Sequence, residues 1–473
     1  MMYYKNIFKK LDNYIDKNRI YTLTKKINEN LHFKFGIKNL YHRMIFTAAA
    51  LVSERYGADL KGIKNRGYEV FRNVIRDTLQ KSLEDSKKQN IKLDILMEVY
   101  IDIKINIVEN IEAINDFIDC VIEISDSVNS DNWNGEDVMG IFFNEFNRYK
   151  KKSESGQIFT PDHITSLMYR ILEVNANDKI LDACCGSGAF LVKSMSNMIK
   201  EVGGINTKEA KKIKEHSLFG IEFDREIFAL ACANMMIHKD GKTNLEQLDS
   251  RDKEASEWIK SKGITKVLMN PPFERKYGCK KIVENVLNSV PSGIKCAFIM
   301  PEKKMEKDKM GKLLEKHHLE AIIKLPEKLF DAGVTTSIYV FETGKKQVGE
   351  IYGCYIEDDG LERVKNQGRQ DIKDKWMELE NYWVDSIRKR NDTKYGTSQW
   401  IDPKKFLSYQ KPKAEFVLYE EDFVKTMMNY LMFKNKIDVK EFSDKLINKT
   451  LYNSEILKED NNIVIKIKDA EDE

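Results

Sequence analysis

The chain has 473 residues, of which 42% are hydrophobic and 32% charged, and its formal net charge is +3. This length predicts two or three domains. No run approaches the ~18 apolar residues of a membrane span, and the charged N-terminal segment lacks an apolar signal core, so we expect no membrane association. The seven cysteines include no C-x-x-C pair, which is typical of free thiols in a reducing cytoplasm.

Residues 1–150 are expected to form a mainly helical domain. Apolar residues recur at helical spacing over 43–56, 67–83 and 91–124. A hydrophilic linker follows and leads to the turn Ser155-Gly156-Gln157-Ile158-Phe159-Thr160-Pro161. Pro161 suits the first position of a helix, and Thr160 is placed to cap that helix through its hydroxyl.

Residues 179–191 predict a strand, a tight glycine turn and a helix. Gly186 and Gly188 allow the backbone to approach a ligand, and the helix N-terminus favours an anionic group such as a carboxylate. Leu191 stands where a dinucleotide fingerprint needs its third glycine. Asp182, at the end of the strand, suits an ammonium group better than a pyrophosphate.

Two further strands also end in acidic residues. The strand 217–222 ends at Glu222, before a helix over about 225–238, and a short strand near 244–248 ends at Asp249. In nucleoside-binding α/β folds an acidic residue at the second strand end takes the ribose hydroxyls. Asp249 is placed to reach an adenine amino group. Three acidic strand ends in succession therefore indicate a binding site.

The apolar run 265–269 predicts a buried strand that ends in Asn270-Pro271-Pro272-Phe273. Neither proline carries an N–H, so the turn is rich in acceptors. The Asn270 carboxamide oxygen and the Pro271 carbonyl could together accept both hydrogens of one amino group, while Phe273 stacks on the flat molecule that bears it. The tetrapeptide thus indicates a holder for the exocyclic amine of a nucleobase.

Seven strand candidates alternate with helical patterns between residues 179 and 342, the last three near 295–300, 319–325 and 337–341. This alternation predicts an α/β core with a mostly parallel sheet and helices on both faces, which we place at 151–345. The pattern is irregular after Gly344, and helices return near 420–432. We expect 346–473 to be a partly helical C-terminal extension that contacts a partner, with a frayed tail from 466.

The motifs G-Q-x-F-T-P, D-x-x-x-G-S-G-x-F-L, G-x-E-x-D and N-P-P-F, in this order, resemble the N6-adenine DNA methyltransferases of the gamma arrangement. Most closely they resemble the modification (M) subunit of type I restriction-modification systems. The resemblance runs from about residue 40 to about 400 and includes segments 320–330, 333–341 and 360–369. The family commonly has Asp-Pro where this chain has Asp182-Ala183, a departure that removes no donor or acceptor.

The resemblance implies a Rossmann-like methyltransferase core that uses S-adenosyl-L-methionine, without a metal. Asp182 would then lie at the methionine end of the cofactor, Glu222 at its ribose and Asp249 at its adenine. The full set of cofactor-binding residues that it implies is Gln157, Phe159, Thr160, Pro161, Asp182, Gly186, Ser187, Gly188, Glu222, Phe223 and Asp249. The catalytic set is Asn270, Pro271, Pro272 and Phe273.

The implied activity is adenine-N6 methylation of double-stranded DNA, with the target base flipped out of the duplex. Roughly 130 residues after the core are few for a DNA-recognition domain, which favours a separate specificity subunit. Whether a restriction (nuclease or translocase) subunit also joins is left open. Two alternatives remain: a stand-alone methyltransferase that reads DNA through its C-terminal segment, and a non-catalytic nucleic-acid-binding scaffold. DNA binding by the isolated chain would favour the former, whereas the intact Asn270 turn argues against the latter.

Overall fold

The computed structural model describes residues 18–85, 90–105, 109–129, 137–149, 159–238, 244–273, 278–306, 311–327, 329–330, 334–365, 368–412, 419–452, 454–459 and 462–467. The chain forms two compact units, residues 1–410 and residues 411–473. Each unit is described by itself below. No helix in the described ranges is both long and apolar enough to cross a membrane.

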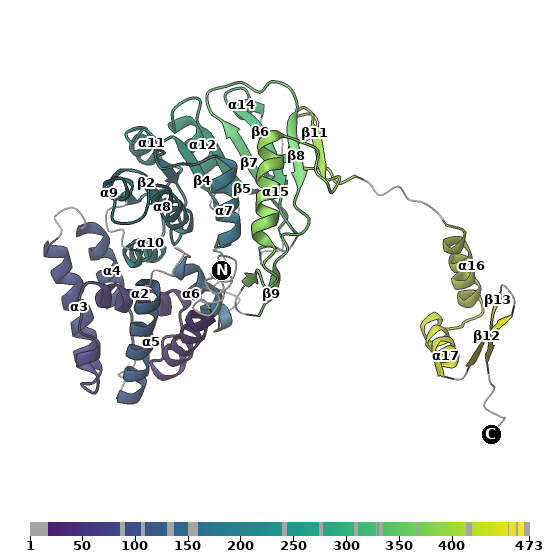
Figure 1. Ribbon diagram of the computed structural model, residues 1–473, viewed down its shortest axis with the longest axis horizontal. Helices are drawn as coiled ribbons and strands as arrows, with labels where there is room; N and C mark the ends of the chain where they lie inside the picture. The colour runs from purple at the N-terminus through teal and green to yellow at the C-terminus, as the bar shows by residue number, and fades with distance from the viewer. Residues whose placement is uncertain are drawn as a thin grey trace, which may run out of the picture. The chain divides into compact units, whose positions relative to one another are not determined.

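The described residues between 18 and 149 are mainly helical, as expected (Figure 1). The main helices there are α2 (Leu40–Arg55), α3 (Tyr68–Asp85), α4 (Asn90–Asp102), α5 (Ile111–Asn129) and α6 (Val138–Phe146). The Asn39 side chain accepts from two backbone N–H groups and starts α2. These helices share an aromatic core in which Phe46, Phe71 and Phe117 are fully buried.

The helical pattern over 91–124 is divided between two helices. α4 ends at Asp102 and α5 begins at Ile111. The Asn110 side chain accepts the Ala113 N–H at 3.0 Å, which caps a new helix N-terminus.

A nine-stranded sheet forms the centre of the first unit, with the strand order β11-β8-β6-β7-β5-β4-β1-β2-β3. Its first seven strands in the sequence are β1 (Ile180–Asp182), β2 (Leu218–Glu222), β3 (Asn244–Gln247), β4 (Lys266–Met269), β5 (Lys295–Pro301), β6 (His318–Lys324) and β7 (Thr336–Glu342). β7 is antiparallel to β5 and β6, whereas β3, β2, β1, β4 and β5 pair in parallel. These are the seven strands that the sequence predicts.

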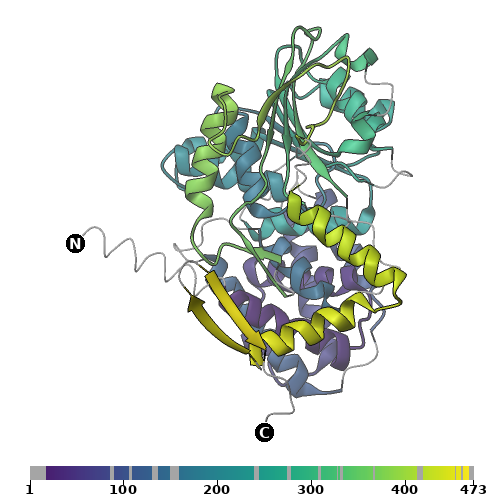
Figure 2. The same cartoon turned by 90° about the vertical axis from the view of Figure 1, so that its right-hand side faces the viewer.

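Helices cover both faces of the sheet (Figures 1 and 2). One face packs against α8 (Ala189–Glu201) and α10 (Arg225–Ile237) in the same hydrophobic core as the N-terminal helices. The other face packs against α11 (Lys253–Lys260) and α12 (Cys279–Ser289) in a second core. The α/β core with a mostly parallel sheet and helices on both faces, expected from the sequence, is therefore confirmed.

The segment after Gly344 completes the first unit, although its sequence pattern is irregular. β8 (Ile351–Tyr355) pairs in parallel with β6, and β11 (Ser398–Ile401) pairs with β8 in antiparallel fashion. These strands are too short for periodicity to reveal. Between them lie the hairpin β9–β10 (Glu362–Val364 and Gly368–Gln370) and α15 (Trp376–Lys389), which packs on α7 (Asp162–Ile171). The divisions expected at residues 150 and 345 stay predictions.

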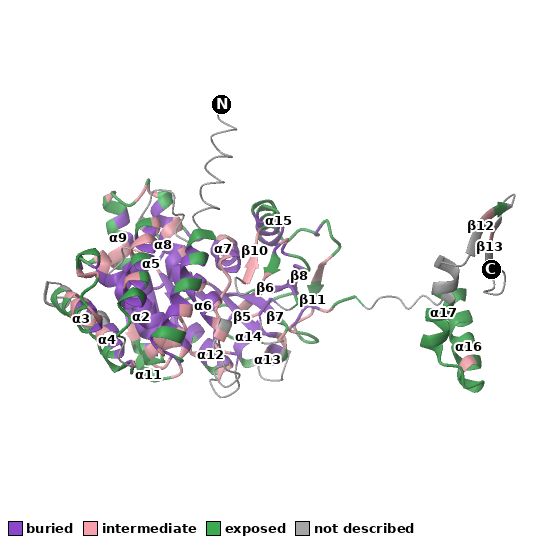
Figure 3. Cartoon of the chain, turned by 90° about the horizontal axis from the view of Figure 1, so that it is seen from below, coloured by how far each residue is buried: buried purple, intermediate pink, exposed green. Residues whose placement is uncertain are grey.

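The second unit consists of α16 (Glu420–Lys434), α17 (Val439–Tyr452) and a hairpin of β12 (Ser454–Glu459) and β13 (Asn462–Ile467). Its first helix matches the helix expected over 420–432. No residue of α16 is buried, and Figure 3 shows this helix exposed along its length. Of the tail expected to fray, residues 468–473 lie outside the described ranges.

Candidate functional site

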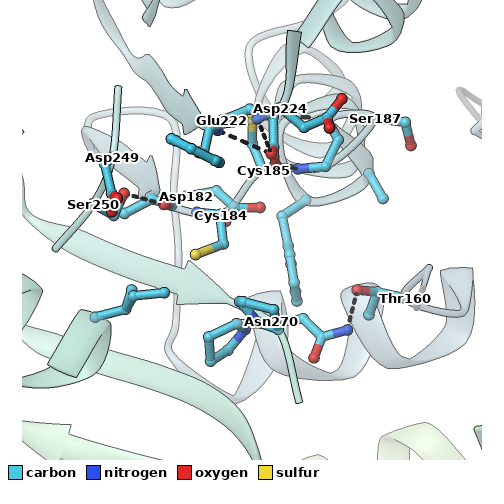
Figure 4. Close-up of a pocket in the computed structure, with 18 of the residues that line it drawn as sticks. Thr160, Asp182, Cys184, Cys185, Ser187, Glu222, Asp224, Asp249, Ser250 and Asn270 are labelled. Carbon is cyan, nitrogen blue, oxygen red and sulfur yellow. Dashed lines mark hydrogen bonds between the residues drawn. The ribbon is translucent and has the colours of Figure 1, made fainter. Parts of the chain in front are cut away.

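A pocket lies where the strands β1, β2 and β4 end (Figure 4). These strands run in parallel, so their carboxyl ends meet at one edge of the sheet, which is where α/β folds bind ligands. Asp182 ends β1, Glu222 ends β2, and Asn270 directly follows β4. The structure thus brings three residues predicted from separate motifs into one pocket.

The glycine turn between β1 and α8 forms one wall of the pocket. Gly186 has a φ of +55° and Gly188 a φ of +91°, a region of backbone conformation that favours glycine. A Cβ atom added at Gly186 would meet no atom within 4 Å, so the backbone there borders open space. The turn is held by the Gly188 N–H, which donates to the Cys185 carbonyl at 2.7 Å, and by the Cys185 N–H, which donates to Ile221 at 2.9 Å.

The Asp182 carboxyl is buried and accepts the Cys184 N–H at 3.1 Å. Burial raises its pKa well above the ordinary aspartate value, and the nearby Glu222 carboxylate raises the pKa further. Burial also raises the pKa of Glu222. The two Glu222 oxygens accept backbone N–H groups, one from Gly186 at 3.0 Å and the other from Phe223 and Asp224 at 2.9 and 3.0 Å. Two acidic groups in such surroundings favour a cationic or hydroxyl-bearing ligand.

Asp249 follows β3 and is paired with Arg251, a residue that the sequence reasoning missed. The Arg251 Nε atom donates to both carboxylate oxygens, at 2.8 and 3.0 Å, and the Nη2 atom also contacts the carboxylate. The hydrogen bonds from Arg251 lower the pKa of Asp249. A nucleobase amine that binds Asp249 therefore has to share the carboxylate with a guanidinium group.

The Asn270 carboxamide has one end bound and one end free. Its Nδ2 atom donates to the Thr160 hydroxyl at 3.0 Å. Its Oδ1 atom is buried and has no hydrogen-bond partner among the residues that the structure describes. A buried acceptor without a partner costs free energy, and the two prolines that follow offer no N–H. This oxygen is therefore available to a ligand.

Two phenylalanines of the predicted site are packed against other rings. Phe273 is buried and meets Phe330 edge to face, with ring centroids 5.5 Å apart. Phe159 stacks on Phe143 of α6 with centroids 3.7 Å apart. The helical N-terminal part thereby supports the pocket wall. Packing of both rings limits their motion and fixes the shape of this side of the pocket.

Most of the predicted site residues line the pocket: Phe159, Thr160, Asp182, Gly186, Ser187, Glu222, Phe223, Asp249, Asn270, Pro271, Pro272 and Phe273. Pro161 and Gly188 are adjacent to lining residues but do not line the pocket themselves, and Gln157 lies outside the described residues. The roles assigned to these residues stay predictions. Two expectations were wrong: α7 begins at Asp162, so Pro161 is its N-cap rather than its first residue, and Thr160 does not cap the helix, because the N-cap makes no side-chain hydrogen bond.

Other lining residues are not in the predicted site set: Ala183, Cys184, Cys185, Ala189, Phe190, Asp224, Leu248, Ser250, Arg251 and Ile282. Their positions next to strand ends are the signal that could have indicated most of them. Cys184 is partly buried, and desolvation raises the pKa of its thiol well above the ordinary value, so the thiol remains protonated and is a poor nucleophile. We assign it no chemical role.

Comparison with known proteins also points to the part of the chain that forms the pocket. Residues 135–297 match the family model described as N-6 DNA Methylase, and this region contains every pocket residue named above. The chain is 29% identical over 340 residues to the "Type II restriction enzyme and methyltransferase RM.BcgI" of Heyndrickxia coagulans, covering 66% of this chain and 51% of the relative. It is 23% identical over 321 residues to the "Type I restriction enzyme MjaVII methylase subunit" of Methanocaldococcus jannaschii, covering 56% and 53%. The chain thus spans about half the length of these curated relatives.

Two solved structures share the fold. One is a type I restriction-modification methyltransferase subunit from Streptococcus thermophilus, with a TM-score of 0.53, 16% identity and coverage of 82% of this chain and 96% of that chain. The other is a chain of a type I R-M system studied for complex assembly and conformational transition, with a TM-score of 0.56, 15% identity and coverage of 91% and 98%. Together, these findings confirm the resemblance to N-6 DNA methylases and to type I modification subunits that the motifs indicate.

Proposed function

We propose that this protein is a DNA adenine-N6 methyltransferase that acts as the modification subunit of a type I-like restriction-modification system. The observation that carries the proposal is the buried, unpartnered Oδ1 atom of Asn270. It lies in one pocket with the Asp182 and Glu222 carboxyl groups. Such a reaction needs two parts. One is an acceptor for the target amine, here Asn270 Oδ1, and the other is a set of acidic groups for a cationic nucleoside, here Asp182 and Glu222.

The pocket residues suit S-adenosyl-L-methionine. Asp182 has a raised pKa in the absence of a cation, so a bound ammonium group would stabilise its ionised form. Glu222, at the end of the second strand, would accept hydrogen bonds from the ribose hydroxyls. The open space beside Gly186 leaves room for a ligand to approach the backbone. When bound, this group supplies an activated methyl.

In the proposed reaction, the chain positions the target amine and stabilises charge. The adenine amino nitrogen is a poor nucleophile because its lone pair is delocalised into the ring. Asn270 Oδ1 and the Pro271 carbonyl would accept its two hydrogens and stabilise the positive charge that develops on the nitrogen. Asn270 has no basic function near neutral pH, so its role is hydrogen bonding rather than proton abstraction. Alignment of the reacting groups would supply much of the acceleration.

Phe273 would stack on the flipped base and offset part of the cost of unpairing, which is roughly a few kcal/mol. Its ring already packs edge to face on Phe330, so the stacking surface is held in place before the base arrives. Asn at position 270 favours adenine as the target, by resemblance to the family.

The second unit supports the proposal of a specificity subunit as partner. α16 has no buried residue, yet it carries large apolar side chains that are at least 45% exposed, namely Phe423, Val424, Met427, Met428, Tyr430, Leu431 and Phe433. Contiguous exposed apolar surface of this kind marks a protein interaction site. We propose that α16 and α17 contact the subunit that reads the DNA sequence.

The decisive experiment measures transfer of labelled methyl from S-adenosyl-L-methionine to duplex DNA, with and without a reconstituted specificity subunit. Asn270→Ala should lower the turnover rate at least a hundredfold and leave cofactor affinity by calorimetry unchanged. Asn288→Ala, at an exposed position of α12, is the matched control. Full activity of Asn270→Ala would refute the catalytic assignment. Methylation by the isolated chain would favour the stand-alone alternative.

A further inference from the structure

We propose that Thr160 is a positioning residue that holds the Asn270 carboxamide with its oxygen directed to the target amine. This inference rests on the proposed function and deepens it, and it replaces the cofactor-binding role that the family resemblance implies for Thr160 with a positioning role. The two residues are 110 positions apart in the sequence, and the Asn270 Nδ2 atom donates to the Thr160 Oγ1 atom at 3.0 Å (Figure 4). The same carboxamide leaves its Oδ1 atom buried and unpartnered within the described part of the chain. A single hydrogen bond therefore occupies one end of the group and leaves the other for a ligand.

The Thr160 hydroxyl is available for this role because it does not cap a helix. Thr before Pro at the start of a helix usually caps the N-terminus through its hydroxyl. Here α7 begins at Asp162, its N-cap is Pro161, and no side chain makes the capping hydrogen bond. The hydroxyl instead reaches across to the turn after β4. This departure from the usual local arrangement points to a use in the pocket.

The backbone that carries Thr160 is anchored by the first turn of α7. Asp162 forms an ion pair of 2.7 Å with Lys193 of α8, the helix that follows the glycine turn. His163 contacts the fully buried Asp359 at 3.1 Å, and Asp359 is also bound by Arg369. Burial would raise the pKa of Asp359, but its hydrogen bonds to His163 and Arg369 outweigh burial and lower the pKa to about 2. Asp359 is therefore ionised near neutral pH, where it can hold both His163 and Arg369.

These contacts give Thr160 a defined position relative to both halves of the pocket. The ion pair between Asp162 and Lys193 ties the start of α7 to the helix that follows the glycine turn, and the hydrogen bond from Asn270 ties Thr160 to the turn after β4. A carboxamide turns about its last side-chain bond with broad freedom unless a partner holds it. Loss of the Thr160 hydroxyl would leave the Asn270 Nδ2 atom without this acceptor. The carboxamide would then spend part of its time in orientations that do not direct Oδ1 to the target amine. Because a small misplacement of a reacting group costs up to about a hundredfold in rate, the turnover rate should depend on this bond.

The test compares Thr160→Val, which keeps the shape but removes the hydroxyl, with Thr160→Ser, which keeps the hydroxyl but removes the methyl. In the reconstituted complex, Thr160→Val should lower kcat by roughly tenfold to a hundredfold, with KM and Kd for S-adenosyl-L-methionine within about twofold of wild type. Thr160→Ser should restore most of kcat. Thr165→Val is the control, because its hydroxyl bonds within α7 to the Asp162 carbonyl at 2.7 Å.

The outcomes separate the inference from the proposed function. Equal kcat for wild type and Thr160→Val would overturn the positioning role while methylation stands. A rise in Kd for the cofactor without a change in kcat would also overturn it and assign Thr160 to cofactor binding. If the wild-type protein transfers no methyl, the proposed function fails. The positioning role of Thr160 is then tested by crystal structures of both variants. The inference requires the Asn270 side chain to move in Thr160→Val and to stay in place in Thr160→Ser.

Discussion

Asp137 offers a measurable link between the helical N-terminal part and the glycine turn. It caps α6, where its Oδ1 atom accepts the Met139 N–H at 3.0 Å and the Asn234 Nδ2 atom at 2.8 Å. The same Nδ2 atom of Asn234 donates to the Ser187 carbonyl at 2.8 Å. Burial raises the pKa of Asp137 from 3.8 to about 6, against the opposing effect of the Asn234 hydrogen bond.

The sign of the effect on stability follows from the raised pKa. Because the folded protein binds this proton more tightly than the unfolded chain does, the contribution of Asp137 is fully present below about pH 4. It is lost as the pH rises through about 6. A pKa difference of about two corresponds to about 3 kcal/mol. Ionisation of this one carboxyl should therefore lower the free energy of unfolding by about 3 kcal/mol between pH 4 and neutral pH.

Asp137→Asn removes the titration, so the stability of the variant relative to wild type should rise by about 3 kcal/mol over this range. The measurement is urea unfolding followed by tryptophan fluorescence at several pH values. If the NH2 group of the new asparagine faces the Gly140 N–H, the variant loses stability by an amount that does not depend on pH. The test is therefore how the stability difference between variant and wild type changes with pH. Asp252→Asn, at the exposed N-cap of α11, is the control. A difference that stays constant with pH, or falls, would refute the reasoning.

Two further predictions concern the pocket. Gly186→Asp should abolish binding of S-adenosyl-L-methionine in calorimetry. The new side chain would project into the open space beside the turn, from a backbone with a φ of +55°. It would also place a third carboxylate near Asp182. Gly293→Asp, at an exposed position with a φ of +79°, should bind normally; equal loss in both variants would mean that strain rather than the pocket is responsible. Phe273→Ala should raise KM for DNA by roughly tenfold, since stacking on an aromatic side chain is worth about 1–3 kcal/mol per base, while cofactor affinity stays unchanged. An unaltered KM for DNA in a steady-state assay would count against a stacking role.

The sequence by itself determined the core fold and the composition of much of the pocket. Buried strands can be recognised in the sequence as short apolar runs. Asp182, Glu222 and Asn270 stand at or directly after the ends of three of these runs. Since parallel strands place their carboxyl ends at one edge, residues far apart in the chain could be assigned to one site without knowledge of any contact. The two prolines after Asn270 likewise predict a turn with more hydrogen-bond acceptors than donors, because proline lacks an N–H in any environment.

Only the tertiary structure decided which side chains meet. The Thr160 hydroxyl is equally suited to cap a helix or to bind another side chain, and only the tertiary fold brings it within 3.0 Å of the Asn270 Nδ2 atom. The pairing of Arg251 with Asp249 depends on a rotamer that no pattern records. β8 and β11 join the sheet through backbone hydrogen bonds to distant strands, so their membership is a property of the whole sheet. Such contacts depend on three-dimensional packing, whereas local periodicity reports only which face of an element is buried.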